Sequence, residues 1–106
     1  MEIAIDSAMV AKMRNAGESC IGANRFYVHA SVIQEFSVRL ASEMGKLNVG
    51  DGLEENIDVG PLVNEKTLNK VEQLVDQAIA LGANVLTAGK RIDTKGLFYS
   101  PTTIAD

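Results

Sequence analysis

The second half of the sequence predicts an amphipathic helix that leads directly into a short apolar stretch. Asn64 is a favourable helix-capping residue, and Gly82 supplies a stop in the left-handed conformation. Between them, apolar residues recur with the helical period of 3.6, at Leu68, Val71, Leu74, Val75, Ala78 and Ile79. Residues 83–89 (ANVLTAG) then predict a strand, which we expect to be parallel and buried.

A first helix is predicted over residues 1–16. Ile5, Met9 and Met13 recur at i, i+4 and i+8, and Gly17 can adopt the left-handed conformation that ends a helix. No capping residue precedes this pattern, so we expect the chain to begin inside a helix and to be a piece of a larger domain.

The next segment predicts a strand followed by another helix. Residues 24–30 (NRFYVHA) are rich in aromatic and β-branched side chains, which favour a strand. Ser31 and Gln34 form a capping-box pattern. The helix that they open has one apolar face, made of Val32, Phe36, Leu40 and Met44.

The remaining segments complete an α/β pattern. Residues 48–61 predict a loop, 90–96 a turn, and 97–104 a third strand that Pro101 keeps at a sheet edge or bends. Alternating strands and helices predict an α/β fold, here a three-layer fragment built on a parallel sheet with right-handed crossovers. Parallel sheets need cover on both faces, which again indicates part of a larger domain.

Composition excludes several classes of function. Ten basic against 14 acidic residues give a net charge of −4, so no basic face is available for nucleic acid. The single Cys and single His cannot form a zinc cluster or an internal disulfide, and no metal site is expected. No apolar run approaches the roughly 18 residues of a membrane helix, and we expect a cytoplasmic protein that does not bind a membrane. A small molecule or another protein surface is the expected partner.

Chemistry is concentrated in residues 14–25 (RNAGESCIGANR). Cys20, the only thiol, lies between a predicted helix end and a predicted strand, with Gly17 and Gly22 on either side. Small neighbours leave room for a substrate carbonyl, and a backbone N–H of such a turn can face a developing oxyanion. The alternative is that Cys20 is a small buried apolar residue, as most lone cysteines are.

Three charged or titratable residues lie near Cys20 in the sequence. Arg14 either interacts with the negative end of the helix dipole or clamps a substrate carboxylate with its planar guanidinium. His29 could serve as a base, but we expect it to point to solvent from the end of a strand. Glu18 is expected to be a solvated acid in a turn.

These residues carry a family resemblance. The stretch NAGESCIGANRFYVH resembles the catalytic-cysteine signature of NAD(P)-dependent aldehyde dehydrogenases. The likeness continues through V-G-D-G (49–52), G-P-L-x-N (60–64) and FYSPTTIAD (98–106), and so covers essentially the whole chain. An R-N-x-G-[QE]-x-C box is typical of the succinate-semialdehyde dehydrogenases. Two departures are Met13, where Phe is usual, and Gly22, where some of these enzymes have a second Cys for a redox switch.

The resemblance implies a mechanism for an intact enzyme. Cys20 attacks the aldehyde carbonyl, hydride passes to NAD or NADP, and water hydrolyses the resulting thioester. The resemblance also implies that Arg14 holds the distal carboxylate of succinate semialdehyde, and that the intact enzyme is a homo-oligomer acting on a small aldehyde.

The resemblance also implies that parts of the enzyme lie outside this chain. The cofactor-binding domain, the oxyanion Asn and the general base would all lie elsewhere. Residues 1–106 would then be a partial, cysteine-bearing catalytic domain with no cofactor-binding residues, inactive by itself. A non-catalytic α/β interaction module and a dehydrogenase for another aldehyde remain as alternatives.

Overall fold

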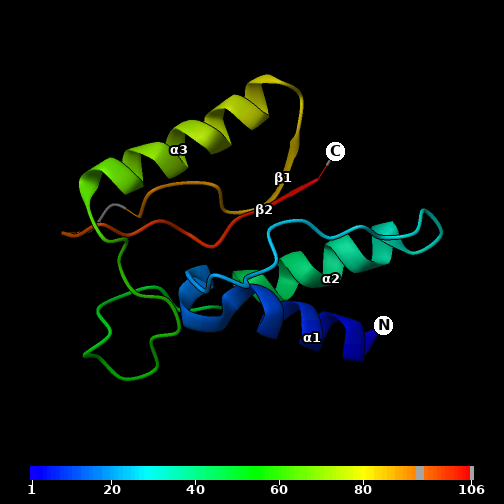
Figure 1. Ribbon diagram of the computed structural model, residues 1–106, viewed down its shortest axis with the longest axis horizontal. Helices are drawn as coiled ribbons and strands as arrows, with labels where there is room; N and C mark the ends of the chain where they lie inside the picture. Colours follow the sequence, from blue (N-terminus) through cyan, green and yellow to red (C-terminus); the bar gives the residue numbers. More distant parts are fainter. Residues whose placement is uncertain (93–94, 106) are drawn as a thin grey trace.

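The computed structural model describes residues 1–92 and 95–105 and contains helices on both sides of a small β-ribbon. Helices α1 and α2 pack together on one side, and α3 lies on the other (Figure 1). The elements, in chain order, are α1 (Glu2–Met13), the 3₁₀ turn η1 (Arg14–Gly17), α2 (Ile33–Gly45), α3 (Glu65–Ala80), β1 (Asn84–Thr87) and β2 (Thr103–Ala105).

Helices α1 and α2 form the first apolar cluster. Its buried members are Ile5 and Ala8 from α1, and Phe36, Leu40 and Met44 from α2. The predicted apolar face of α2 is confirmed at its three buried positions. The Thr87 hydroxyl donates to the Ala41 carbonyl at 2.9 Å, which attaches β1 to this helix pair.

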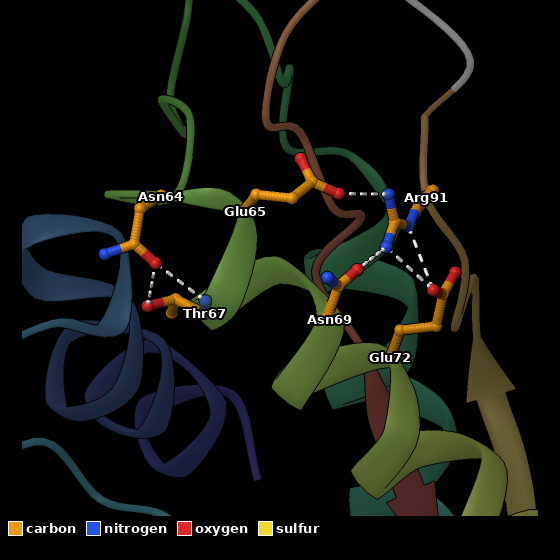
Figure 2. A network of polar contacts seen from close by, with 6 residues as sticks. All are labelled: Asn64, Glu65, Thr67, Asn69, Glu72 and Arg91. Atoms are coloured by element: carbon orange, nitrogen blue, oxygen red, sulfur yellow. Dashed lines mark hydrogen bonds and ion pairs between the residues drawn. The ribbon is translucent and has the colours of Figure 1, made fainter.

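Helix α3 carries the second apolar cluster, where Leu68 and Val75 pack with Tyr99. Its predicted cap is confirmed, because the Asn64 side chain accepts a hydrogen bond from the Thr67 N–H at 2.8 Å (Figure 2). Gly82 has a φ of 99°, the conformation expected of a helix-ending glycine.

Arg91 ties the ribbon side of the molecule to α3. Its guanidinium pairs with Glu65 at 3.0 Å and with Glu72 at 2.9 Å, and it also donates to the Asn69 side chain (Figure 2). These three partners lie on one face of α3 at helical spacing. The two carboxylates raise the pKa of Arg91 above its ordinary value, so it remains charged.

The prediction of a parallel, buried sheet is wrong. β1 pairs with β2 in the antiparallel sense, with Val85 opposite Ile104, and β1 residues alternate between exposed and half-buried. Of the predicted strand 97–104, only Thr103 and Ile104 lie in β2, and an isolated antiparallel bridge joins Arg91 to Tyr99. The chain between β1 and β2 folds back on itself, and antiparallel pairing requires no crossover helix. The predicted turn over 90–96 includes residues 93–94, which lie outside the described residues.

The predictions between α1 and α2 are also corrected. Residues 24–30 form no strand, because no described segment supplies a ladder partner, and Tyr27 is 93% exposed. The capping box does not form: the Ser31 hydroxyl lies 2.8 Å from His29 Nδ1, and Val32 occupies the N-cap position of α2 without a side-chain hydrogen bond. The predicted helix over 1–16 is α-helical only to Met13.

The predicted loop over residues 48–61 is confirmed. It contains no helix or strand, and an isolated parallel bridge between Val49 and Val59 closes it. Asp58 strengthens the closure through its carboxylate, which accepts from the Asn48 N–H at 2.8 Å. The loop lies beside the C-terminal end of α1.

Candidate functional site

The segment that leads from α1 to Cys20 has an unusual backbone. Arg14 leaves the helix with φ −54° and ψ 126°. Asn15, Ala16 and Gly17 then follow with φ values of 52°, 54° and 84°. Three consecutive left-handed residues reverse the course of the chain within one turn, and this ends α1 at Met13.

Cys20 occupies a tight turn that follows this reversal. The Gly22 N–H donates to the Ser19 carbonyl at 2.9 Å, which places Cys20 and Ile21 at the two central positions. Cys20 is exposed, so the interpretation of this thiol as a small buried residue is wrong. A Cβ at Gly22 would lie 3.0 Å from the Ser19 carbonyl, so a larger residue at this position would require the turn to shift by a few tenths of an ångström.

The backbone of the turn leaves a donor free. Within residues 1–92 and 95–105, the Cys20 N–H takes part in no backbone hydrogen bond. An N–H on the same residue as a nucleophile can donate to the oxygen of a carbonyl that the thiol attacks. The turn therefore presents a thiol and an amide donor together at the surface.

Arg14 lies at the start of the same segment. It is exposed, and its guanidinium forms no ion pair or hydrogen bond with any residue that the structure describes. No hydrogen bond joins it to Cys20, so the structure places both residues in one loop without bringing them into contact. An exposed, always-charged guanidinium can bind a carboxylate from solution in a bidentate manner.

His29 and Glu18 do not complete a catalytic pair with Cys20. His29 is exposed, as predicted, and its Nδ1 is engaged with Ser31 rather than with the thiol. Glu18 is exposed and helps to line an open hollow of about 360 Å³. The hollow lies between the α1 end (Met13, Asn15, Ala16 and Glu18) and the 48–61 loop (Gly52, Ile57, Asp58, Gly60 and Pro61), and neither Cys20 nor Arg14 lines it.

One side-chain contact at this loop was not predicted from the sequence. Lys12 Nζ donates to Asn24 Oδ1 at 2.8 Å, so it joins the last turn of α1 to the chain that follows the Cys20 turn. The sequence predicts a strand over residues 24–30 and pairs Asn24 with no other residue. No local pattern links two residues that are twelve positions apart when the segment between them is irregular.

Other classes of site are absent from the described part of the chain. Residues 1–92 and 95–105 contain no group of three His, Cys, Asp or Glu side chains that could hold a metal ion. Across the same residues, every helix is too short or too polar to cross a membrane.

Comparison with known proteins gives this geometry a context. The sequence model of the aldehyde dehydrogenase family matches residues 1–106. The chain belongs to the aldehyde dehydrogenase family. The structural match agrees: the crystal structure of a succinate-semialdehyde dehydrogenase from Burkholderia pseudomallei is 40% identical with a TM-score of 0.91, over 97% of this chain and 21% of that one.

Two curated relatives carry a more specific name. The chain is 44% identical over 106 residues to a succinate-semialdehyde dehydrogenase of Paenarthrobacter nicotinovorans. It is 39% identical over 106 residues to the succinate-semialdehyde dehydrogenase [NADP(+)] of Escherichia coli. All of this chain is covered in both comparisons, but it spans only 24% and 22% of the lengths of these relatives.

The described residues do not fit a dinucleotide. Phosphate groups bind where a glycine-rich turn joins a strand to the N-terminus of a helix. Here β1 is followed by β2, and the first turn of α3 is already capped by Asn64 through Thr67.

Proposed function

We propose that residues 1–106 are part of the catalytic domain of an NAD(P)-dependent aldehyde dehydrogenase that oxidises succinate semialdehyde to succinate. The observation that carries this proposal is the exposed Cys20 in the Ser19–Gly22 turn, within a chain that matches the family over its full length. The relative from E. coli is named for NADP, which supports a pyridine nucleotide as the electron acceptor of the intact enzyme.

The chemistry proposed for this chain is addition of a thiol to a carbonyl. The Cys20 thiolate attacks the aldehyde carbon, a C–S bond forms, and the carbonyl electron pair moves to oxygen. The free Cys20 N–H is available to donate to that oxygen. Residues outside this chain would bind the nucleotide and supply the general base.

The proposed substrate follows from Arg14. An aldehyde held by Cys20 at one end and by a guanidinium at the other needs a distal carboxylate, as in succinate semialdehyde. The exposed Arg14 side chain is available for this contact. We further propose that the intact enzyme is a cytoplasmic homo-oligomer, as the family resemblance implies.

The proposal is tested with a hybrid enzyme in which residues 1–106 replace the matching segment of the E. coli relative. We expect the hybrid to oxidise succinate semialdehyde, and Cys20→Ser to reduce activity to background because a serine hydroxyl is a much weaker nucleophile toward the aldehyde carbon than a thiolate. Ser19→Ala, which changes the neighbouring hydroxyl, is the matched control and should remain active. A folded hybrid without activity, or an active Cys20→Ser variant, would contradict the proposal.

A further inference from the structure

The loop that carries Arg14 and Cys20 has few bonds of its own. Among the described residues, its backbone hydrogen bonds are local: the Glu18 N–H donates to Asn15 O at 3.0 Å and the Gly22 N–H to Ser19 O at 2.9 Å. These bonds shape the two turns, but neither one connects the loop to a helix. The orientation of the loop must therefore be set at its two ends.

The first anchor at the ends is a backbone hydrogen bond. The Ala23 N–H donates to the carbonyl of Ala11 at 3.0 Å. The last four carbonyls of a helix have no partner within the helix, and Ala11 lies in the final turn of α1. The chain that follows the Cys20 turn thus satisfies a carbonyl at the end of α1 and lies against the last turn of that helix.

The second anchor is the Lys12 side chain. A Cβ built at Gly17 would lie 3.5 Å from Lys12 Cε and 3.6 Å from Lys12 Nζ, so the lysine stem crosses the loop against this glycine. Its ammonium then reaches Asn24 Oδ1 at 2.8 Å, one residue beyond the backbone anchor. Lys12 therefore contacts the loop at the reversal and also at its exit.

We propose that Lys12 and Asn24 are a positioning pair that holds the Cys20 turn in a fixed orientation relative to α1. The proposal rests on the proposed function of Cys20. Reaction between a thiol and a carbonyl requires a defined approach, and small displacements of a catalytic group cost much of the rate. Neither residue of the pair is required to touch substrate. Their effect on the reaction passes through the loop that carries Cys20.

The kinetic test uses the active hybrid enzyme with Lys12→Met and, separately, Asn24→Ala. We expect kcat for succinate semialdehyde to fall roughly ten- to a hundredfold in each variant. KM should change by less than about twofold, because Arg14 directly follows the last residue of α1 and keeps its place when the Cys20 turn moves. Asn24→Asp should restore most of kcat, since a carboxylate accepts from the Lys12 ammonium at least as well as an amide oxygen.

A matched control separates this effect from the general loss of a surface lysine. Lys46 is exposed, and its ammonium donates to Glu43 Oε1 at 2.6 Å at the end of α2. Lys46→Met should leave kcat and KM unchanged. If Lys12→Met has the same kcat as Lys46→Met, the positioning role is wrong. The role is also wrong if Asn24→Ala lowers kcat and Asn24→Asp lowers it equally.

A second measurement does not depend on catalysis. In the 106-residue chain, loss of the contact between Lys12 and Asn24 should expose the Ala23 amide, so its hydrogen exchange should accelerate roughly tenfold or more in Lys12→Met and Asn24→Ala. Amides in the first turns of α1 should exchange at unchanged rates. An unchanged exchange rate at the Ala23 amide would contradict the positioning role of Lys12 and Asn24, even if Cys20 is the nucleophile. Accelerated exchange in an inactive hybrid would instead contradict the proposed function alone.

Discussion

Arg14 makes a prediction about substrate choice at the scale of a single residue. In the hybrid enzyme, Arg14→Ala should remove a charge-assisted contact worth about 1.5–3 kcal/mol, so kcat/KM for succinate semialdehyde should fall roughly ten- to a hundredfold. Steady-state kinetics with an uncharged aldehyde of similar length provide the control, for which little change is expected. Equal losses on both substrates would mean that Arg14 only supports the end of α1.

Tyr99 makes a prediction about alkaline pH. Its side chain is 7% exposed and its buried hydroxyl has no partner among the described residues. Burial, with help from the Asp76 and Glu72 carboxylates, raises the pKa of Tyr99 above its ordinary value of 10.0. The folded chain therefore holds this proton where the unfolded chain releases it, and stability that is present below pH 10 is lost as the pH rises above it.

The measurement for Tyr99 is an alkaline titration followed by phenolate absorbance, together with urea unfolding. Tyr99→Phe should remove the late-titrating phenolate and the loss of stability that accompanies it. It should also stabilise the chain near neutral pH by on the order of 1 kcal/mol, because a buried hydroxyl without a partner is deleted. Tyr27→Phe removes the exposed tyrosine and should leave the late-titrating phenolate in place. If the late titration disappears in Tyr27→Phe, it does not belong to Tyr99.

The candidate residues differ in how readily the sequence reveals them. Cys20 and Arg14 could be selected because the thiol is unique and a glycine lies on either side of it. The contact between Lys12 and Asn24 could not be predicted from the sequence, because it depends on the three consecutive left-handed residues from Asn15 to Gly17. Only Gly17 in that run has the residue type that predicts a positive φ.

At the scale of elements, the cap of α3 makes a direct prediction. Asn64→Ala removes the acceptor of the Thr67 N–H and should cost about 1 kcal/mol of folding free energy, measured by urea unfolding. Asn64→Asp, which keeps the acceptor oxygen, is the matched control and should retain most of the stability. If Asn64→Ala leaves the free energy of unfolding unchanged, the first turn of α3 frays in solution.

Helices were predicted better than strands in this chain, for a physical reason. A helix such as α3 satisfies its backbone internally, so the cap at Asn64 and the apolar period are sufficient to place it. A strand depends on a distant partner that no local pattern reveals. Residues 24–30 have strand-like composition and no ladder partner in the described chain, whereas β1 has a partner, in the sense opposite to the one predicted.

At the scale of the whole molecule, the apolar interior is divided. Leu40 belongs to the cluster between α1 and α2, and Leu68 to the separate cluster beneath α3. The β-ribbon lies between them and attaches to α2 through Thr87. The family and the general helix content could be predicted from sequence, but the division into two clusters depends on the antiparallel return of residues 97–105.

The divided interior predicts two local stabilities. Leu40→Ala and Leu68→Ala should each cost about 2–5 kcal/mol in the affected cluster. Hydrogen exchange should show faster amides in α1 and α2 for the first variant, and in α3 for the second. If both variants accelerate exchange in all three helices alike, the chain unfolds as one cooperative unit.

The left-handed backbone at Ala16 has a consequence for chemical synthesis. An L-residue with a φ of 54° is in the conformation that its mirror-image form prefers. A D-alanine at this position should therefore raise the thermal midpoint, while D-alanine at the α-helical Ala8 should lower it. Because Cys20 is the only cysteine and follows shortly after, a peptide ending at Ser19 can be ligated to one beginning at Cys20. The same turn that exposes the thiol thus provides the junction through which a mirror-image residue can be introduced.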